Sequence, residues 1–409
     1  MAQLLDNTAL ANALLKLVRA QHFELTPDSL EGGQPIQAFP SLDLAVAVFP
    51  HGAAPVWANV LFSRDFPNGH VAHIADQAGA VNNVRYLKDQ LNAALDSVAW
   101  LPGADWARFN WQALYGNAGP TFVEPYPASL LKVMVMVGVA RLVDTGKINW
   151  DNEHRFEGIT KTIAAWTDSM IVASNNDATT ALVAVLHQGQ LIVRQGDTET
   201  NHLHALFAEY GLPTLRLANT KPDGGWRSAQ GAGVGNIHMT AWDTVRLLWL
   251  LSDDYASAPW LPAGTAPMLS EACRQRVWQF MGEQGLHAVL SSTSIAGVAG
   301  WQSGIPARLS SRWQQPDGSV LVEDIWFPAD VRAANDAAKV HFAHKTGNTE
   351  NYCSDAGLVQ AYSKHGRRYI IALLSNLGSR YQADPDCDTT WRIPALGHAI
   401  DQLIADHFE

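Results

Sequence analysis

The chain has 409 residues, of which 47% are hydrophobic and 16% charged, a composition typical of a folded globular protein rather than a disordered or fibrous one. Its formal net charge is −11, and Arg367-Arg368 is the longest basic run, so neither nucleic acid nor an anionic membrane surface is expected as a partner. The longest apolar stretch has about eleven residues, whereas a membrane-spanning helix needs about 20.

The N-terminal half begins with a helix and a pair of strands. Residues 5–20 carry apolar side chains at helical spacing, and Asp6 or Asn7 is the expected cap. Two β-rich runs, 42–49 and 56–62, are joined by a segment with the composition of a hairpin turn. A second helix is predicted from about Asn83 to Val98, and we place a domain boundary near residues 75–80.

The middle of the chain is predicted to be helical and its end to form a sheet. A stretch with seven Gly and Pro residues, 213–237, interrupts the helices and is expected to be a long surface loop. Helices in the middle followed by strands that pair antiparallel indicate an α/β (α+β) fold, with a sheet that the N-terminal strands could also join. The expected helices are 127–145, 161–173, 177–188, 200–210, 240–252 and 391–407, and the expected strands are 340–345, 356–362 and 369–375.

One short motif stands at the start of the most apolar helix. Residues 126–132 read Tyr-Pro-Ala-Ser-Leu-Leu-Lys, so Ser129 and Lys132 share a helix face one turn apart. A serine hydroxyl becomes a nucleophile when a base takes its proton, and a lysine can be that base if desolvation or a nearby cation lowers its pKa. The alternative is a capping serine followed by a surface lysine, since this spacing often occurs by chance.

Two further motifs favour the catalytic interpretation. Ser174-Asn175-Asn176 directly precedes a predicted helix, and Lys345-Thr346-Gly347 ends a predicted strand. With these three motifs in this order, the chain resembles the class A serine β-lactamase and penicillin-binding-protein superfamily of serine hydrolases, whose motifs are S-x-x-K, S-D-N or S-x-N, and K-T-G. The resemblance covers about residues 83–409 and extends to the segments 169–173, 305–309, 355–359 and 370–374.

The resemblance implies a role for each motif residue. Ser129 would be the acylated nucleophile, Lys132 its proton acceptor or relay, and Ser174 the group that passes the proton to the leaving amine. Lys345 would hold positive potential over the site. Asn176 would hydrogen-bond the amide side chain of the substrate, and Thr346 would bind a carboxylate of the substrate. Gly347 and Asn348 would also belong to the substrate-binding site, and the backbone N–H of Asn348 would complete an oxyanion hole with that of Ser129.

The resemblance also implies a domain plan. Residues 81–409 would form a catalytic domain with the fold of the class A β-lactamases, an antiparallel sheet flanked by helices plus an all-helical subdomain at about 127–255. An insertion at about 310–338 and an N-terminal α+β extension, residues 1–80, have no counterpart in the simpler family members.

One departure from the family pattern concerns release of the acyl group. Class A β-lactamases carry a glutamate in a loop between the second and third motifs, and the corresponding stretch, 215–236, contains none. Its only carboxylate, Asp223, stands in a Pro-Asp-Gly-Gly turn sequence. Apolar lining for an acyl pocket is available in Trp226, Trp301, Trp313 and Trp326, for which ordinary core burial is the alternative.

Three functions follow as hypotheses. The first is a serine hydrolase that forms an acyl-Ser129 intermediate on an amide, lactam or ester. The second is a true β-lactamase, and the third is a non-hydrolytic acyl-transfer or ring-forming biosynthetic enzyme, or a binding protein, on the same fold. None needs a metal or another cofactor, and the expected partner is a small or peptide-like substrate with an amide or ester carbonyl.

The first residues show no basic and apolar leader pattern. As printed, the chain is therefore expected in the cytoplasm, or in the periplasm or medium if a leader was removed. This expectation motivates the biosynthetic alternative, because cell-wall substrates lie outside the cytoplasm.

Overall fold

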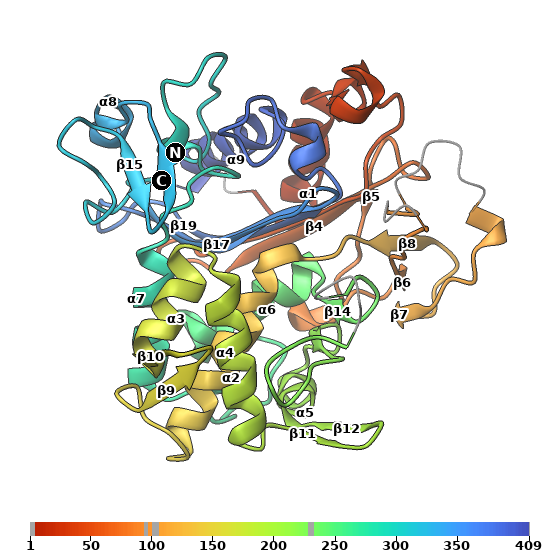
Figure 1. The fold of residues 1–409 in the computed structure, drawn as a ribbon. Coiled ribbons are helices and arrows are strands. Elements are labelled where there is room, and N and C mark those ends of the chain that lie inside the picture. Colours follow the sequence, from red (N-terminus) through yellow and green to blue (C-terminus); the bar gives the residue numbers. More distant parts are fainter. Residues whose placement is uncertain (1–4, 94–96, 100–105, 228–232, 409) are drawn as a thin grey trace.

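The computed structural model describes residues 5–93, 97–99, 106–227 and 233–408. An antiparallel sheet lies across the molecule, with helices above and below it (Figure 1). None of the helices in the described ranges is long and apolar enough to cross a membrane. The sheet has six strands in the order β17-β18-β19-β3-β4-β5, with the bounds β17 Val340–Asn348, β18 Cys353–Ala361, β19 Arg368–Ser375, β3 Leu42–Val48, β4 Val56–Phe62 and β5 His70–Val71.

The two ends of the chain meet in the middle of this sheet. Strand β3 lies between β4 and β19, with Leu44 opposite Val60 on one side and Leu373 on the other. Every residue of β3 is buried, which explains its nearly unbroken apolar sequence. The N-terminal strands therefore do join the sheet. Strands β3, β4 and β5 belong to the same sheet as the C-terminal strands, and the described residues before position 80 contribute to the same apolar core.

One face of the sheet is covered by the first and last helices, α1 (Asn7–Ala20) and α9 (Arg392–Phe408). Asp6 caps α1 by accepting a hydrogen bond of 2.7 Å from the N–H of Ala9. The buried residues Leu10, Leu14 and Val18 recur every four positions and face the strands. Amphipathic spacing thus fixes which side of α1 packs on the sheet.

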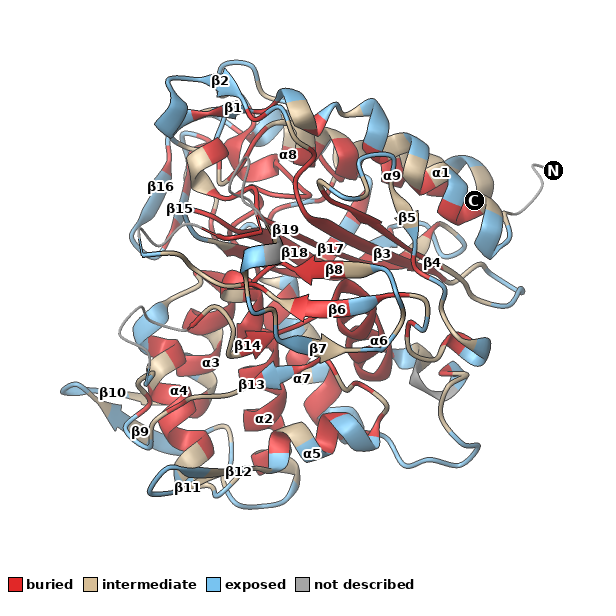
Figure 2. Cartoon of the chain, turned by 90° about the vertical axis from the view of Figure 1, so that its right-hand side faces the viewer, coloured by how far each residue is buried: buried red, intermediate tan, exposed pale blue. Residues whose placement is uncertain are grey.

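The other face carries the helical part of the molecule, whose interior is buried almost throughout (Figure 2). Helix α2 is buried along nearly all of its length, in keeping with its apolar sequence, and α6 packs directly on β3 and β19. The α+β architecture and the antiparallel sheet flanked by helices are confirmed. The helices of this part are α2 Lys132–Asp144, α3 Ile163–Val172, α4 Asn176–Gln188, α5 His202–Glu209, α6 Ala241–Leu251 and α7 Glu271–Gly282.

The helix expected at 83–98 is wrong for the described residues. Strand β6 (Arg85–Lys88) forms there, with β7 (Ala113–Tyr115) and β8 (Thr121–Glu124), a separate three-stranded sheet. Two neighbours, Tyr86 and Leu87, are both buried because the strand is covered on its two faces, and this pattern cannot be distinguished from a short buried helix. Residues 94–96 of the expected helix lie outside the described residues.

The structure also contains two-stranded ribbons and one short helix. Each ribbon is a pair of antiparallel strands, and the segment expected as an insertion, 310–338, contains one ribbon followed by α8 (Arg332–Asp336). The remaining strands are β1 Pro27–Asp28, β2 Gln34–Pro35, β9 Glu153–Phe156, β10 Ile159–Thr162, β11 Ile192–Gln195, β12 Thr198–Asn201, β13 Arg216–Leu217, β14 Ile237–His238, β15 Val320–Val322 and β16 Ile325–Phe327.

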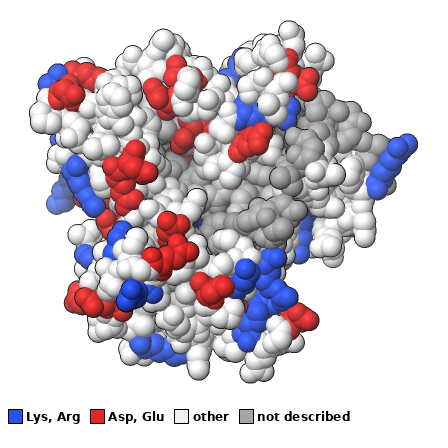
Figure 3. Space-filling view, in the orientation of Figure 1, with Lys and Arg blue, Asp and Glu red and all other residues white. Residues whose placement is uncertain are grey.

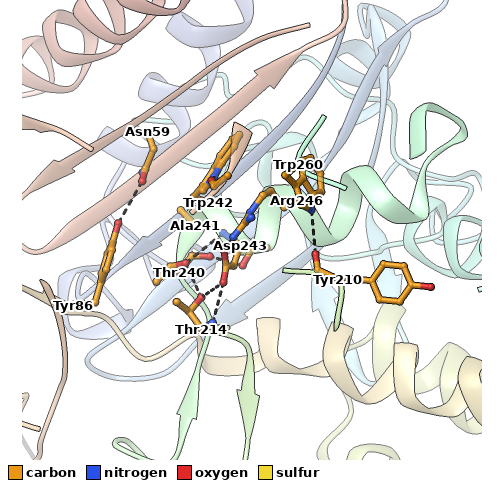
Figure 4. A network of polar contacts seen from close by, with 12 residues as sticks. Asn59, Tyr86, Tyr210, Thr214, Thr240, Ala241, Trp242, Asp243, Arg246 and Trp260 are labelled. Carbon is orange, nitrogen blue, oxygen red and sulfur yellow. Dashed lines mark hydrogen bonds and ion pairs between the residues drawn. The ribbon is translucent and has the colours of Figure 1, made fainter. Parts of the chain in front are cut away.

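A buried polar network ties the long loop 213–237 to the start of α6 (Figure 4). The carboxylate of Asp243 accepts hydrogen bonds from the backbone N–H and the hydroxyl of Thr214, at 2.9 and 2.7 Å, and also pairs with Arg246. The guanidinium of Arg246 lies 5.5 Å from the ring centre of Trp260. The start of the loop is therefore fixed to α6, the helix that packs on the sheet. Between its short strands β13 and β14, the loop reaches the cavity described next.

Candidate active site

Ser129 lies at the junction between the sheet and the helical part. It belongs to a 3-10 turn, η5 (Ala128–Leu131), which runs directly into α2. The hydroxyl of Ser354, on β18, donates a hydrogen bond of 2.6 Å to the carbonyl of Pro127 and so anchors the start of this turn to the sheet. The first motif is thus held by a strand residue that follows Pro127 by 227 positions.

A half-open cavity of about 530 Å³ has Ser129 in its wall. This volume is in the range of small-molecule sites. Apolar and aromatic groups alternate with amides and hydroxyls around it. The lining residues are Leu91, Tyr126, Ala128, Ser129, Leu131, Lys132, Asn176, Thr179, Thr180, Trp226, Gly233, Val234, Asn348, Thr349, Glu350, Asn351 and Tyr352.

Lys132 is buried, with 2% of its surface exposed, and its ammonium group faces the second motif. Its Nζ lies 3.1 Å from Ser174 Oγ and 2.9 Å from Asn176 Oδ1, and it also contacts the backbone carbonyl of Ser174. Burial lowers its pKa well below the ordinary lysine value, and the nearby charge of Lys345 lowers it further. Both effects favour the neutral amine, the form of Lys132 that can accept a proton.

Lys345 approaches the same hydroxyl from the sheet. Its Nζ donates to Ser174 Oγ at 2.9 Å and to the carbonyl of Thr346 at 2.7 Å. Burial lowers its pKa to about 7, while the carboxylates of Asp355 and Asp388 oppose that shift. Both lysines thus meet at one serine hydroxyl, an arrangement that disfavours two simultaneous positive charges.

Ser174 stands in an unusual backbone conformation between α3 and α4. Its φ of 57° is in the left-handed region, which is sparsely populated by residues other than glycine. The next residue, Asn175, caps α4 by accepting a hydrogen bond of 2.9 Å from the N–H of Ala178. This turn directs the side chain of Ser174 toward the two lysines.

The third motif needs its glycine because β17 passes very close to η5. A Cβ atom on Gly347 would lie 2.6 Å from the carbonyl oxygen of Pro127 and 2.7 Å from the backbone N of Leu130. Backbone atoms at such distances must move to admit a methyl group. Thr346 and Gly347 are buried beside this contact and, like Ser174 and Lys345, are not part of the cavity wall.

We expect Gly347→Ala to displace the turn that carries Ser129 and to lower the rate of any reaction at Ser129 by about 100-fold, as displacements near 1 Å do. The rate of labelling by a serine-reactive probe measures this loss. Gly119→Ala is the matched control, because a Cβ at Gly119 would meet nothing within 4 Å. Equal rates for the two variants would contradict the prediction.

The motif residues are therefore brought together as expected, while their roles stay predictions. Ser129, Lys132, Asn176 and Asn348 line the cavity, and Ser174 and Lys345 connect to it through Lys132. Most of the other cavity residues were not among the predicted site residues. Among them are Leu91, from the segment after β6, and two tyrosines, Tyr126 and Tyr352, which pack edge to face with their ring centres 5.6 Å apart.

The four tryptophans proposed as pocket lining have different environments. Trp226 lines the cavity, whereas Trp313 is buried and Trp301 partly buried in a separate apolar cluster. Trp326 is 60% exposed. Asp223 accepts a hydrogen bond of 3.0 Å from the N–H of Gly225, the contact of a turn residue, and is not part of the cavity wall.

Within the described ranges, no group of three or more His, Cys, Asp or Glu side chains is arranged to hold a metal ion. The polar groups that share the cavity wall with Ser129 are mainly hydroxyls and amides, together with the amine of Lys132.

Comparison with known proteins identifies similar folds. No family model and no curated protein matches the chain. Among solved structures, the chain is similar to one titled PBP-A (14% identity, TM-score 0.48, covering 98% of each chain). It is also similar to the extended-spectrum β-lactamases TLA-1 (12%, 0.46, 97% of this chain and 98% of that one) and TLA-3 (12%, 0.46, 98% of each). Similarity at this level carries no statement about substrate or activity.

Proposed function

We propose that the protein is a serine hydrolase that forms an acyl intermediate on Ser129 from an amide, lactam or ester substrate. The observation that carries the proposal is the convergence of two buried lysines, Lys132 and Lys345, on the hydroxyl of Ser174 beside the cavity that Ser129 lines. Burying two amines at one hydroxyl opposes stability, and groups whose pKa values are altered in this way are concentrated at functional sites.

We infer an acylation step that uses these groups. Neutral Lys132 removes the proton from Ser129 Oγ as that oxygen bonds to the substrate carbonyl carbon. The C–N or C–O bond then breaks, and the leaving group takes the proton that Ser174 passes on from Lys132. Positive charge on Lys345 stabilises the oxyanion, and backbone N–H groups of Ser129 and Asn348 would bind it.

Removal of the acyl group needs a base that activates water, and the cavity wall offers few candidates for this base. Glu350 is the one carboxylate among the described residues of the cavity wall, and it is exposed to solvent. Water attack would then rely on Lys132, which must serve both half-reactions. For this reason we rank a true β-lactamase second, and expect turnover of the chromogenic β-lactam nitrocefin to stay near the uncatalysed background.

The substrate is inferred to be a small or peptide-like molecule with a reactive carbonyl. Acidic and basic groups are interspersed over the face seen in Figure 3, consistent with the net charge of −11. The biosynthetic and binding alternatives are less favoured, because a pocket that only binds has no use for two desolvated lysines.

The proposal is tested by covalent labelling. A fluorescent penicillin and a fluorophosphonate should each attach to the wild-type protein, and Ser129→Ala should abolish attachment. Ser363→Ala, an exposed turn serine, should label like the wild type. Mass spectrometry of the adduct should place it on the peptide with Ser129, and the penicillin adduct should persist. Equal labelling of Ser129→Ala and wild type would refute the proposal.

A further inference from the structure

The inserted segment 310–338 packs against the residues that lead into the second motif. Val320, Val322 and Phe327 of its ribbon share one apolar cluster with Val172 and Ala173, the two residues before Ser174. Gly285 lies against Val322 so closely that a Cβ there would be 2.5 Å from its methyl groups. The ribbon therefore packs against the residues that lead into the turn 173–176.

The turn of this ribbon aims a carboxylate at the motif. Glu323 sits between β15 and β16 with a φ of 52°, a conformation uncommon for a non-glycine residue. One of its oxygens accepts a hydrogen bond from the hydroxyl of Ser169, on α3, and the other accepts one of 3.2 Å from the amide of Asn175. A single side chain thus joins the helix before the motif to the motif itself.

Asn175 uses both ends of its amide in this arrangement. Its oxygen caps α4 at the N–H of Ala178, while its NH2 group donates to Glu323. An aspartate at 175 would still cap the helix, but it would place a second carboxylate against Glu323. Asparagine at this position is therefore matched to the carboxylate that comes from the inserted segment.

An ion pair also ties the same segment to the same helix. Arg312 donates two hydrogen bonds, of 2.9 and 2.6 Å, to the carboxylate of Asp168 on α3. Such paired contacts fix orientation as well as distance. Apolar packing, the Arg312–Asp168 pair and Glu323 thus hold the segment in one register against the turn.

We propose that Glu323 is a positioning residue, which holds Asn175 and the strained turn at Ser174 in the geometry that lets Ser174 contact both lysines. The proposal rests on the acyl-enzyme function proposed for Ser129. It gives the inserted segment a role in the site, although Glu323 belongs to none of the three motifs. The carboxylate comes from a residue 148 positions after Asn175.

A double-mutant cycle tests the pair. We expect Asn175→Asp to slow labelling of Ser129 by about tenfold, because two carboxylates then face each other. Adding Glu323→Gln should restore most of this loss in the double variant, since the introduced amide can donate a hydrogen bond to the introduced carboxylate. Asp324→Asn is the matched control, because Asp324 lies in the same turn and has no hydrogen bond or ion pair to another described residue.

Hydrogen exchange provides a readout that does not depend on activity. In Glu323→Ala, the backbone amides of residues 173–177 should exchange faster than in the wild type, while those of Asp324→Ala should not. Unchanged exchange, or equal losses in Asn175→Asp and the double variant, would overturn the role of Glu323. Failure of the wild type to label would instead refute the function of Ser129, and the exchange experiment would still decide the role of Glu323.

Discussion

Replacement of Lys132 by methionine is expected to lower the rate of acylation at Ser129 by about 10²–10⁴-fold, the contribution of a general base. Methionine matches the length of the lysine stem and suits its buried surroundings, but it cannot accept a proton. The acylation rate should be measured with a fluorescent penicillin under single-turnover conditions, and circular dichroism should show that the variant is folded.

The control for this variant is an exposed lysine. Lys364 lies in the turn between β18 and β19, and Lys364→Met should label at the wild-type rate. If Lys132→Met also kept the wild-type rate while Ser129→Ala did not label, the base would have to be another group. That outcome would separate the role of Lys132 from that of Ser129.

Replacement of Lys345 by methionine is expected to shift the pH dependence of acylation. The positive charge of Lys345 lowers the pKa of Lys132, so its removal should raise that pKa and move the rising limb of the pH–rate profile to higher pH. The wild-type rate should also decline as pH rises through about 7, where Lys345 loses its charge, and this decline should vanish in the variant. A profile with both limbs unchanged would contradict the assignment.

The same lysine should also make stability depend on pH. Its pKa is about 7 in the folded protein and 10.5 as the ordinary value, so between these limits the unfolded chain binds more protons. The contribution of Lys345 to the free energy of unfolding therefore rises with pH across that window. Below pH 7 the folded state carries the full cost of a buried charge. Denaturant unfolding of the wild type and Lys345→Met should show a difference in stability that moves in favour of the wild type from about pH 6 to about pH 9.

The regular elements of the fold were largely predictable, because their signals are local. Asp6 and Asn175 cap α1 and α4 from the residue before each helix, the apolar sequences of α2 and α9 lie within each helix, and the strands β3, β4 and β19 are dense in β-branched and aliphatic residues. Strand β6 was mistaken for part of a helix, because a four-residue strand buried on both faces has no alternating pattern.

The site was predictable to the extent that its motifs are contiguous in sequence. Ser129 and Lys132 are one helical turn apart, and their spacing indicates a shared face. Contacts between distant segments leave no such pattern. Glu323 is one acidic residue in a ribbon turn, and its contact with Asn175 depends on how segment 310–338 packs. Tyr352 enters the cavity through the bend after β17, which only the strand register defines.

The central position of strand β3 has a consequence for how the protein is made. During synthesis, residues 42–48 leave the ribosome long before residues 368–375, their partner strand. Until β19 arrives, the hairpin of β3 and β4 has an apolar edge with unpaired backbone groups, a known template for aggregation. The sheet, and with it the strand that anchors the turn of Ser129, can be completed only after residues 368–375 have been made, so the edge of β3 is expected to stay exposed until then.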